Sequence, residues 1–580
     1  MRTRELKDNG GKPEDDPDMT DFDVLIVGGG PSGLMLANEL GQRGVRCLLL
    51  DAKPSTAFNP QANATQARTM EHYRRLGFAH EIRALGLPGD HPTDIAYFTR
   101  LNGFELARLS LPTAHEAVER IKTMKGSWSA AELPHRVSQK FVETVLKDHA
   151  QRYACNDIRY AHRLLDFEDQ ADCVVAHFCA LDRPADIQTV KVKYLVAGDG
   201  PKSTVRHALG LSYTGETGVK RSYMGGQMFA VYMRSKSLYQ HVPHPRAWMY
   251  VTVNPKRRGF LAAVDGLEQF AFHSAVAEGE NPEHWGETEA RQLLLEFMGC
   301  EVDFEILSLQ TWTAGHSLVA EKFQRGRVFL MGDAAHLFTP TGGLGYNTAI
   351  EDAVNLGWKL AAAIANPAHA PVLQTYELER RPLALRNTSY AREFADSVGL
   401  YPVTEAIESD SPAGQAEREL ASIHFNAHVR KEFNIPGVTF GGRYDGSPII
   451  VGDGSTAPSD EANNYIPTAT PGGRPPHAWL EDGSSLYDHF GRNWTLLNLT
   501  GHPDVEHTLQ DAASHAGLDL KCLSPAPDDL LEIQDLYQAH WVIVRPDQIV
   551  AYRCPLSSPA LVNEPDAIWH RLLGLESIAP

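Results

Sequence analysis

The sequence has few cysteines, and none of them stand at a spacing that supports chemistry. The seven cysteines among 580 residues occupy positions 47, 155, 173, 179, 300, 522 and 554. An odd and scattered set of this kind excludes a disulfide framework, a C-x-x-C redox pair and the ligand spacing of a zinc site. We therefore expect a cytoplasmic protein that holds no metal.

Positive charge is also in deficit, and long apolar runs are absent. The chain has 54 Lys and Arg against 73 Asp and Glu, a formal net charge of −19 at pH 7. This balance argues against nucleic acid and anionic membranes as partners. No apolar run of the sequence approaches the roughly 20 residues that a membrane-spanning helix needs. Residues 1–20 are rich in charge, Gly and Pro and fit neither a signal peptide nor a strand, so we expect a disordered tail there.

A glycine loop near the N-terminus carries the first functional signal. Gly28-Gly29-Gly30-Pro31-Ser32-Gly33 follows the apolar run 23–27, and Asp51 closes a second apolar run at 47–50. In G-x-G-x-x-G the first glycine makes the turn, the second lets the backbone approach a pyrophosphate, and the third lets helix and strand pack closely. The acid after the second strand accepts hydrogen bonds from ribose hydroxyls. An ordinary strand-to-helix turn is the alternative, but strand, helix and acid in register favour an adenine dinucleotide held by Gly28, Gly30, Pro31, Ser32, Gly33 and Asp51.

A second glycine-rich loop indicates which dinucleotide is bound. A short strand ends in Gly332-Asp333, and the loop Pro340-Thr341-Gly342-Gly343-Leu344-Gly345-Tyr346-Asn347 precedes a helix expected from Thr348 to about residue 365. Asp333 can accept hydrogen bonds from ribitol hydroxyls, and the glycines let backbone N–H groups approach a flat ring. The helix N-terminus supplies positive charge where a reduced flavin gathers negative charge. The pattern favours a flavin, with a plain strand–loop–helix connection as the alternative.

Three motifs together resemble the class A flavoprotein aromatic hydroxylases, the group of phenol hydroxylase and p-hydroxybenzoate hydroxylase. They are the loop 28–33 with Asp51, the stretch 194–200 with Asp199 continuing to Ser203 and Arg206, and Gly332-Asp333 with the Pro340…Gly343-x-Gly345-x-Asn347 loop. The similarity covers roughly residues 21–395. Two further stretches resemble family segments beside the flavin less sharply: 61–77, with Gln61 and Arg68, and 136–139, with Arg136 and Gln139.

The resemblance implies an α/β fold in several parts. At 580 residues and 43% hydrophobic content, the chain has room for about three domains. Residues 21–90, 134–212 and 312–395 are expected to form a Rossmann-like FAD-binding domain, interleaved with a β-sheet substrate domain from 91–133 and 213–311. A helical and linker region at 396–475 leads to residues 476–580, which resemble a thioredoxin-like domain without C-x-x-C.

The resemblance also implies a reaction. NAD(P)H reduces FAD, the reduced flavin captures O2, and a C4a-hydroperoxide transfers one oxygen atom to a phenolic ring. The sequence contains no second strand–G-x-G-x-x-G–helix unit, which agrees with a pyridine nucleotide that binds only transiently. Baeyer–Villiger oxidation or epoxidation on the same fold is one alternative, and a flavin-binding scaffold without turnover is another. Dimers are frequent in the family, so the resemblance admits a homodimer.

The catalytic base is not identified by the sequence. Phenol-hydroxylase relatives often place an acid or a histidine beside the flavin, where this chain has Ala62-Asn63-Ala64-Thr65 without a titratable group. Asn63 can hydrogen-bond a substrate hydroxyl or, equally well, its own backbone. Trp248 and Tyr250 alternate onto one face of an expected strand, where aromatic rings either sandwich a substrate or fill the core. A neutral, aromatic site favours a bulky phenol or polyphenol over a small benzoate.

Overall fold

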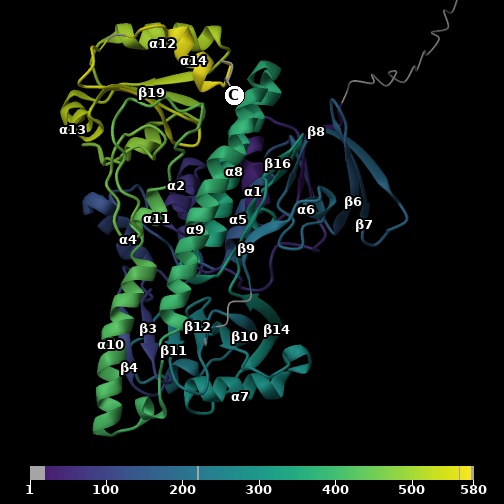
Figure 1. The fold of residues 1–580 in the computed structure, drawn as a ribbon, viewed down its shortest axis with the longest axis vertical. Coiled ribbons are helices and arrows are strands. Elements are labelled where there is room, and N and C mark those ends of the chain that lie inside the picture. Colours follow the sequence, from purple (N-terminus) through teal and green to yellow (C-terminus); the bar gives the residue numbers. More distant parts are fainter. Residues whose placement is uncertain (1–19, 218–220, 222, 561, 576–580) are drawn as a thin grey trace, which may run out of the picture.

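The computed structural model describes residues 20–217, 221, 223–560 and 562–575. Except for Thr20, the tail predicted at 1–20 lies outside the described residues. A Rossmann-like domain occupies the middle of the elongated molecule, a sheet domain lies at one end and the C-terminal domain at the other (Figure 1). No helix in these ranges is both long and apolar enough to cross a membrane.

The Rossmann-like domain is built on five parallel strands in the order β17–β8–β1–β2–β5. Their residues are mostly buried apolar runs, as expected for parallel strands covered on both faces. The meander β6–β7 leads antiparallel into β8, and β17, on the same side of β8, pairs with β16. The strands are β1 (Phe22–Val27), β2 (Cys47–Asp51), β5 (Asn156–Tyr160), β6 (His162–Asp169), β7 (Val174–Ala180), β8 (Gln188–Ala197), β16 (Gln324–Arg325) and β17 (Val328–Leu330).

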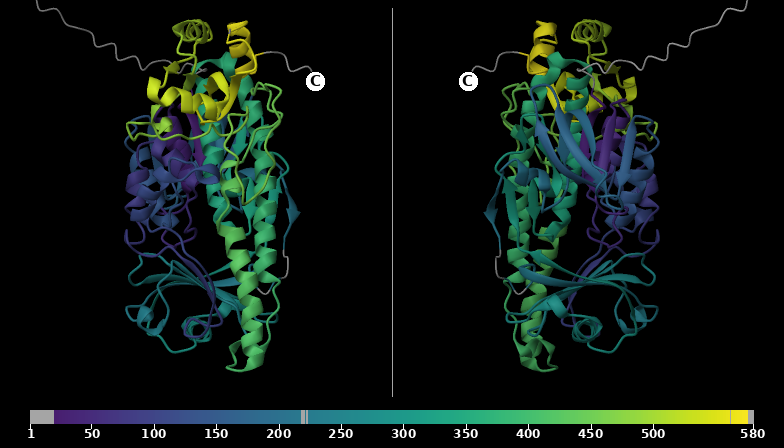
Figure 2. Two further views of the ribbon diagram at one scale, coloured as in Figure 1. Left: turned by 90° about the vertical axis from the view of Figure 1, so that its left-hand side faces the viewer. Right: turned by 90° about the vertical axis from the view of Figure 1, so that its right-hand side faces the viewer.

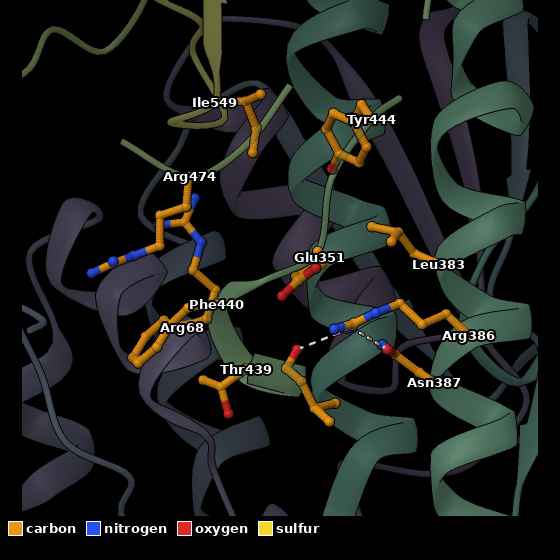
Figure 3. A pocket seen from close by; sticks show the side chains of 12 residues that line it. Arg68, Glu351, Leu383, Arg386, Asn387, Thr439, Phe440, Tyr444, Arg474 and Ile549 are labelled. Atoms are coloured by element: carbon orange, nitrogen blue, oxygen red, sulfur yellow. Dashed lines mark hydrogen bonds between the residues drawn. The ribbon is translucent and has the colours of Figure 1, made fainter. Parts of the chain in front are cut away.

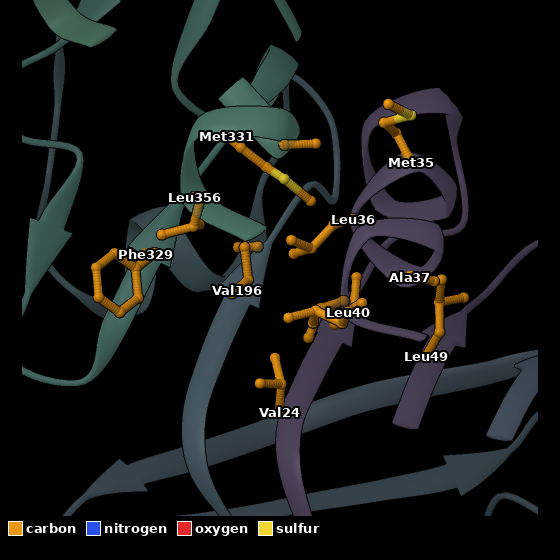
Figure 4. Close-up of a cluster of buried hydrophobic side chains, with 14 of the residues drawn as sticks. Val24, Met35, Leu36, Ala37, Leu40, Leu49, Val196, Phe329, Met331 and Leu356 are labelled. Atoms are coloured by element: carbon orange, nitrogen blue, oxygen red, sulfur yellow. The ribbon is translucent and has the colours of Figure 1, made fainter. Parts of the chain in front are cut away.

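Helices α1 (Pro31–Gly41), α5 (Gln139–Ala150) and α8 (Leu344–Ala365) cover this sheet. Figure 4 shows the core between them, where Leu36 and Leu40 of α1 meet Val24 and Val196 of the central strands. All four side chains are fully buried, which is worth about 1.5–3 kcal/mol for each large aliphatic side chain. This packing fixes the position of the glycine loop between β1 and α1.

The sheet domain has seven strands in the order β14–β10–β13–β12–β11–β3–β4. The parallel pairing of β3 with β11 joins the two insertions, 91–133 and 213–311, into one sheet. Helix α7 (Glu287–Met298) covers one face, where Phe297 packs on Phe272 with ring centroids 5.0 Å apart. The strands are β3 (Ile95–Phe98), β4 (Glu105–Leu109), β10 (Gly226–Arg234), β11 (Met249–Thr252), β12 (Gly259–Ala263), β13 (Gln269–Ala275) and β14 (Glu305–Ala314).

Two long helices, α9 (Thr375–Gly399) and α10 (Pro412–Phe433), run lengthwise along the molecule toward the sheet domain (Figure 2). Helix α10 packs on β4 at the edge of that sheet. A small sheet, β18–β15–β9, lies beside α9. The other strands and α-helices before the C-terminal domain are β9 (Tyr213–Glu216), β15 (Ser317–Ala320), β18 (His336–Phe338), α2 (Ala67–Arg75), α3 (Ala79–Arg83), α4 (Ala114–Arg120), α6 (Thr204–Ala208) and α11 (Pro436–Phe440).

The C-terminal domain has the strand order β20–β19–β21–β22, with β19 parallel to β20 and the other pairs antiparallel. Its β-α-β-α-β-β-α succession is that of a thioredoxin-like fold, and all seven cysteines of the chain are free. The predicted fold class is therefore confirmed. The elements are β19 (Trp494–Asn498), α12 (Pro503–His515), β20 (Leu520–Leu523), α13 (Pro527–Tyr537), β21 (Ala539–Val544), β22 (Val550–Pro555) and α14 (Pro565–Leu572).

Candidate active site

The first glycine loop has the geometry that a pyrophosphate needs. Gly28 has φ +109°, and a Cβ on it would lie 2.2 Å from the carbonyl oxygen of Gly198. A Cβ on Gly33 would lie 1.9 Å from the carbonyl oxygen of Gly28, whereas one on Gly30 would meet nothing within 4 Å. The first and third glycines thus allow the chain to pack, and the second leaves open space before Pro31 at the N-terminus of α1. Ser32 follows Pro31 in the first turn and is buried.

Asp51 closes the loop from the end of β2. Its Oδ2 accepts a hydrogen bond of 2.7 Å from the Gly29 amide, and its Oδ1 accepts one of 2.6 Å from the Lys53 amide. Tyr160 of β5 donates to the carbonyl oxygen of Gly29 at 3.0 Å. A carboxylate has about four acceptor positions, so Asp51 is fixed in orientation and can still accept from ribose hydroxyls.

Asp199 marks the point where β8 ends against the glycine loop. Its Oδ2 accepts from the Val205 amide at 3.3 Å, while its buried Oδ1 has no partner among the described residues. Burial raises the pKa of this carboxyl group. Ser203 caps α6 by accepting from the Arg206 amide at 2.9 Å. The unpaired oxygen is an available acceptor beside the pyrophosphate loop.

Arg206 and Tyr213 connect this motif to the second glycine-rich loop, residues 332–347, which we call the flavin loop. Arg206 donates to the Tyr213 hydroxyl at 2.7 Å and to the carbonyl oxygen of Ala334 at 3.3 Å. The Tyr213 hydroxyl donates in turn to the carbonyl oxygen of Asp333. These bonds hold the Gly332-Asp333 backbone in place and leave the Asp333 side chain exposed, where it can accept from a ribitol chain.

The flavin loop is tied to the segment predicted to lie beside the ring. Gly342 and Gly343 have φ +69° and +64°, and a Cβ on Gly343 would lie 3.1 Å from that of Ala64. Asn347 Oδ1 accepts from the Gln66 amide (2.8 Å) and from Thr69 Oγ1 (2.7 Å). Its Nδ2 donates to the carbonyl oxygens of Ala64 (3.0 Å) and Gly343 (2.6 Å).

Asn347 therefore uses its amide to join two loops. Pro340 and Gly345, the other predicted residues of this loop, differ in their surroundings. Pro340 is exposed, and a Cβ on Gly345 would make only ordinary contacts with Phe338.

The two stretches with the weaker resemblance, 61–77 and 136–139, differ in the exposure and hydrogen bonding of their side chains. Gln61 is exposed, and the Gln139 amide donates to the carbonyl oxygen of Ala62 at 2.7 Å, which holds the 61–65 segment. The Gln139 side chain donates to Glu143 at 2.7 Å. Arg136 is buried with its guanidinium 4.5 Å from the centre of the Trp248 ring, and its Nη1 has no partner in the described structure. Burial lowers the pKa of Arg136 to about 10.

Arg68, which was predicted to contact the cofactor, bonds the C-terminal domain. Its guanidinium donates to Glu71 and Gln548 side chains and to the backbone oxygens of Asp547 and Gln548, at 3.0–3.3 Å. These bonds commit it to the tip of the β21–β22 hairpin of the C-terminal domain. Arg68 was predicted to contact the cofactor; in the structure its guanidinium has these partners instead, and local sequence does not reveal them.

Figure 3 shows a small hollow beside Arg68 of α2, which Glu351 and Arg386 also line. Its volume of about 30 Å3 suits water and excludes an aromatic ring.

One face of the sheet domain is turned to the Rossmann-like domain. Tyr232 accepts from Lys140 of α5 at 2.7 Å, and Ser308 bonds Asn59 at 2.5 Å. Strand pairing places five partly exposed side chains on that face. We call them the substrate wall: Ala230, Met249, Phe260, His273 and Trp312.

The sequence did not identify these residues. Tyr250 pairs with Leu261, which pairs with Phe272 on the α7 side, and its ring is fully buried. The register thus turns Tyr250 to the opposite face, where its ring fills the core, the second of the two alternatives that the sequence left open. Trp248 is 4% exposed and lies under Arg136, at the junction of the domains.

Two further polar groups lie near the flavin loop. Asn63 Oδ1 is buried and has no hydrogen-bond partner among the described residues. Glu432, at the end of α10, accepts from the Gly342 amide at 2.9 Å, and His428 Nε2 lies 2.9 Å from its other oxygen. No sequence pattern identifies Glu432, because its partner is a backbone amide of a distant loop.

Comparisons with known proteins agree with this geometry. A family model described as "FAD binding domain" matches residues 21–391, and one described as "Aromatic-ring hydroxylase, C-terminal" matches 468–574. The chain is 32% identical over 527 residues to aklavinone 12-hydroxylase DnrF of Streptomyces peucetius, covering 87% of this chain and 98% of that one. It is 28% identical over 597 residues to 2,4-dichlorophenol 6-monooxygenase of Delftia acidovorans, covering 95% and 98%. The flavin-dependent monooxygenase PieE, solved with FAD and substrate, superimposes with a TM-score of 0.83 at 27% identity, covering 96% and 100%.

The family inferred from the three motifs is thus confirmed, together with FAD as the cofactor. The first glycine loop leaves space at the N-terminus of α1, and Asp199 and Asp333 present free acceptors, so the residues fit FAD. NAD(P)H as the reductant is a general property of the family. This chain belongs to the class A flavoprotein hydroxylases and is an FAD-dependent monooxygenase that hydroxylates an aromatic ring.

Proposed function

We propose that this enzyme hydroxylates a bulky phenol or polyphenol whose ring system lies on the substrate wall. The observation that carries the proposal is the set of partly exposed rings on the face turned to the Rossmann-like domain. Phe260 and Trp312 offer flat apolar surface, on which aromatic rings stack favourably. Burial lowers the pKa of His273 to about 4, so the third ring is neutral at pH 7. A neutral, extended wall suits a large uncharged ring system better than a small benzoate.

Asn63 is proposed to orient the phenolic hydroxyl. Its unpaired Oδ1 is an acceptor, and leaving a buried acceptor unpaired costs about 1–3 kcal/mol. A substrate hydroxyl that donates to Oδ1 removes this cost. Asn63 does not titrate, so it orients the hydroxyl without taking its proton.

The remaining residues are proposed to hold FAD, which supplies the activated oxygen once NAD(P)H has reduced it. Gly28, Gly30, Pro31, Ser32 and Gly33 receive the pyrophosphate, and Asp51 the ribose. Asp199 and Asp333 accept from the linking hydroxyls and phosphate-bound water. Gly343, Gly345, Pro340 and Asn347 shape the loop against the flavin ring, while Gln61, Arg136 and Gln139 support the segment beside it.

The cellular setting is also a proposal. The net charge of −19 supports a protein with neither nucleic-acid nor membrane partners, and seven free cysteines support the reducing cytoplasm. We propose a homodimer in solution, which light scattering on a sizing column tests. A mass of one chain, 64.0 kDa, across micromolar concentrations contradicts it.

Product mass spectrometry under 18O2 tests the proposed reaction. The enzyme is incubated with NAD(P)H and a panel that contains a three-ring phenol, 2,4-dichlorophenol, a cyclic ketone and an alkene. One labelled oxygen on the intact ring of the large phenol, at a higher kcat/KM than on 2,4-dichlorophenol, is expected. A preference for the one-ring phenol contradicts the proposal, and a labelled lactone or epoxide assigns the enzyme to the rival reaction.

A further inference from the structure

His273 is the polar member of the substrate wall. It lies on β13 opposite Phe260 of β12, and the two rings stack with centroids 4.4 Å apart and planes within 6°. On its other side it faces Ala230 of β10. Because Ala230 is small, Trp312 of β14 reaches across β10, and its Nε1 donates to His273 Nδ1 at 3.1 Å.

This hydrogen bond determines where the imidazole carries its proton. An indole N–H is only a donor, so His273 Nδ1 must be the acceptor. A neutral imidazole has one acceptor nitrogen and one N–H, and the proton is therefore on Nε2. Burial favours the neutral ring, in agreement with this assignment.

The Nε2–H group has no acceptor among the residues that the structure describes, and the side chain keeps partial exposure. It is a donor of fixed direction in a wall that is otherwise apolar. The stack on Phe260 and the bond from Trp312 restrict the ring, so little rotational freedom is lost when a partner binds.

We propose that His273 is a specificity-determining residue, whose Nε2–H donates to a carbonyl oxygen on the ring system of the substrate. The inference rests on the proposed function and narrows the substrate to a polycyclic phenol that also carries a keto or quinone oxygen. Asn63 offers an acceptor to a hydroxyl and His273 a donor to a carbonyl, so the two polar groups recognise opposite features of one flat molecule.

The test compares two probes that differ in the carbonyl groups, 2-hydroxyanthraquinone and 2-hydroxyanthracene, in which the hydroxyl is too far from a carbonyl for an internal hydrogen bond. Binding to the FAD-loaded enzyme is measured by the change in flavin absorbance, and kcat/KM is measured where turnover occurs. H273F keeps a ring to stack on Phe260 and removes the N–H. We expect it to weaken 2-hydroxyanthraquinone binding about tenfold, the value of one net hydrogen bond, and to leave 2-hydroxyanthracene binding unchanged.

Y250F is the matched control, because Tyr250 lies on the opposite face of the same sheet. It should leave the ratio of the two affinities as in the wild type. Equal weakening of both probes by H273F would mean that His273 only packs, and no change for either would also overturn the proposal.

Two outcomes of the binding measurement on the wild type separate this inference from the proposed function. Failure of the wild type to bind 2-hydroxyanthracene counts against a large ring system as substrate and so against both claims. Binding of both probes with equal affinity overturns only the role of His273.

The tautomer of His273 is tested separately. Long-range 1H–15N NMR spectra of the wild type should show the proton on Nε2, and W312F should give a mixture of tautomers. A proton on Nδ1 in the wild type contradicts the assignment.

Discussion

Arg545 and Glu379 form a two-point ion pair that fastens the C-terminal domain to α9. Arg545 Nη1 and Nη2 donate to the two carboxylate oxygens at 2.7 and 2.9 Å, and both side chains are completely buried. Lys359 of α8 donates to the same carboxylate at 2.6 Å. A thioredoxin-like domain without a cysteine pair thus serves as a structural support for the helices behind the flavin loop.

The first prediction concerns this pair. E379Q leaves Arg545 and Lys359 buried without their shared counter-charge, so we expect the free energy of unfolding to fall by about 3–5 kcal/mol. Urea denaturation followed by circular dichroism measures the change. E119Q, which breaks an exposed pair with Lys122, should change it by less than about 1 kcal/mol. Equal effects of the two variants would contradict the structural role of the buried pair.

The second prediction is a pH dependence that arises at α2. Burial alone would raise the pKa of Glu71, but Arg474 and Arg68 outweigh burial and lower it to about 2. A carboxyl group with a depressed folded-state pKa stabilises the fold above its unfolded value of 4.5 and loses this effect as pH falls toward 2. Glu71 therefore contributes about 3 kcal/mol at neutral pH.

Unfolding free energies between pH 6 and pH 3 test this dependence. E71Q should have a lower stability at pH 6 and a shallower decline toward pH 3 than the wild type. A decline of equal slope in the two proteins would show that other carboxylates cause the acid sensitivity.

The third prediction separates the roles of the glycines in the first loop. G33A places a methyl group against the Gly28 carbonyl, so we expect little folded protein. G30A meets no protein atom and has a compatible backbone at φ −78°, so it should fold normally while its methyl group hinders the pyrophosphate. We expect at least tenfold weaker FAD binding by G30A, measured by titration of the apoprotein. FAD affinity equal to that of the wild type would exclude Gly30 from the cofactor site.

The fourth prediction assigns Asn63 to the substrate. N63A removes the unpaired acceptor, and kcat/KM for a phenol should fall about tenfold, the value of one net hydrogen bond. The pH at which kcat/KM is half-maximal should stay the same, because Asn63 does not titrate. A shifted pH profile, or a variant as active as the wild type, would show that Asn63 does not orient the hydroxyl.

The parts of the site that depend on local chain geometry could be predicted from the sequence. Gly28, Gly33 and Asp51 are determined by one strand–turn–helix–strand unit, and their contacts lie within that unit or on the neighbouring strand β8. The fold class followed from the order of the motifs. Neither inference required knowledge of which distant segments meet.

The parts that depend on distant contacts could not be predicted. Arg68 was expected near the cofactor, but three of its four hydrogen bonds go to residues about 480 positions later in the chain. Tyr250 and Phe260 lie on neighbouring strands, and only the pairing register shows that Phe260 faces the Rossmann-like domain. Glu432 bonds a backbone amide of the flavin loop, a contact that leaves no mark on the sequence.

A structure of the enzyme with FAD and 2-hydroxyanthraquinone tests the central claim most directly. We predict that the ring system lies on Phe260 and Trp312, with its carbonyl oxygen within about 3 Å of His273 Nε2 and its hydroxyl against Asn63. The hydroxylated ring should be the one nearest the flavin loop at Gly342–Gly343. A substrate bound elsewhere, with the substrate wall covered by protein, would contradict the account.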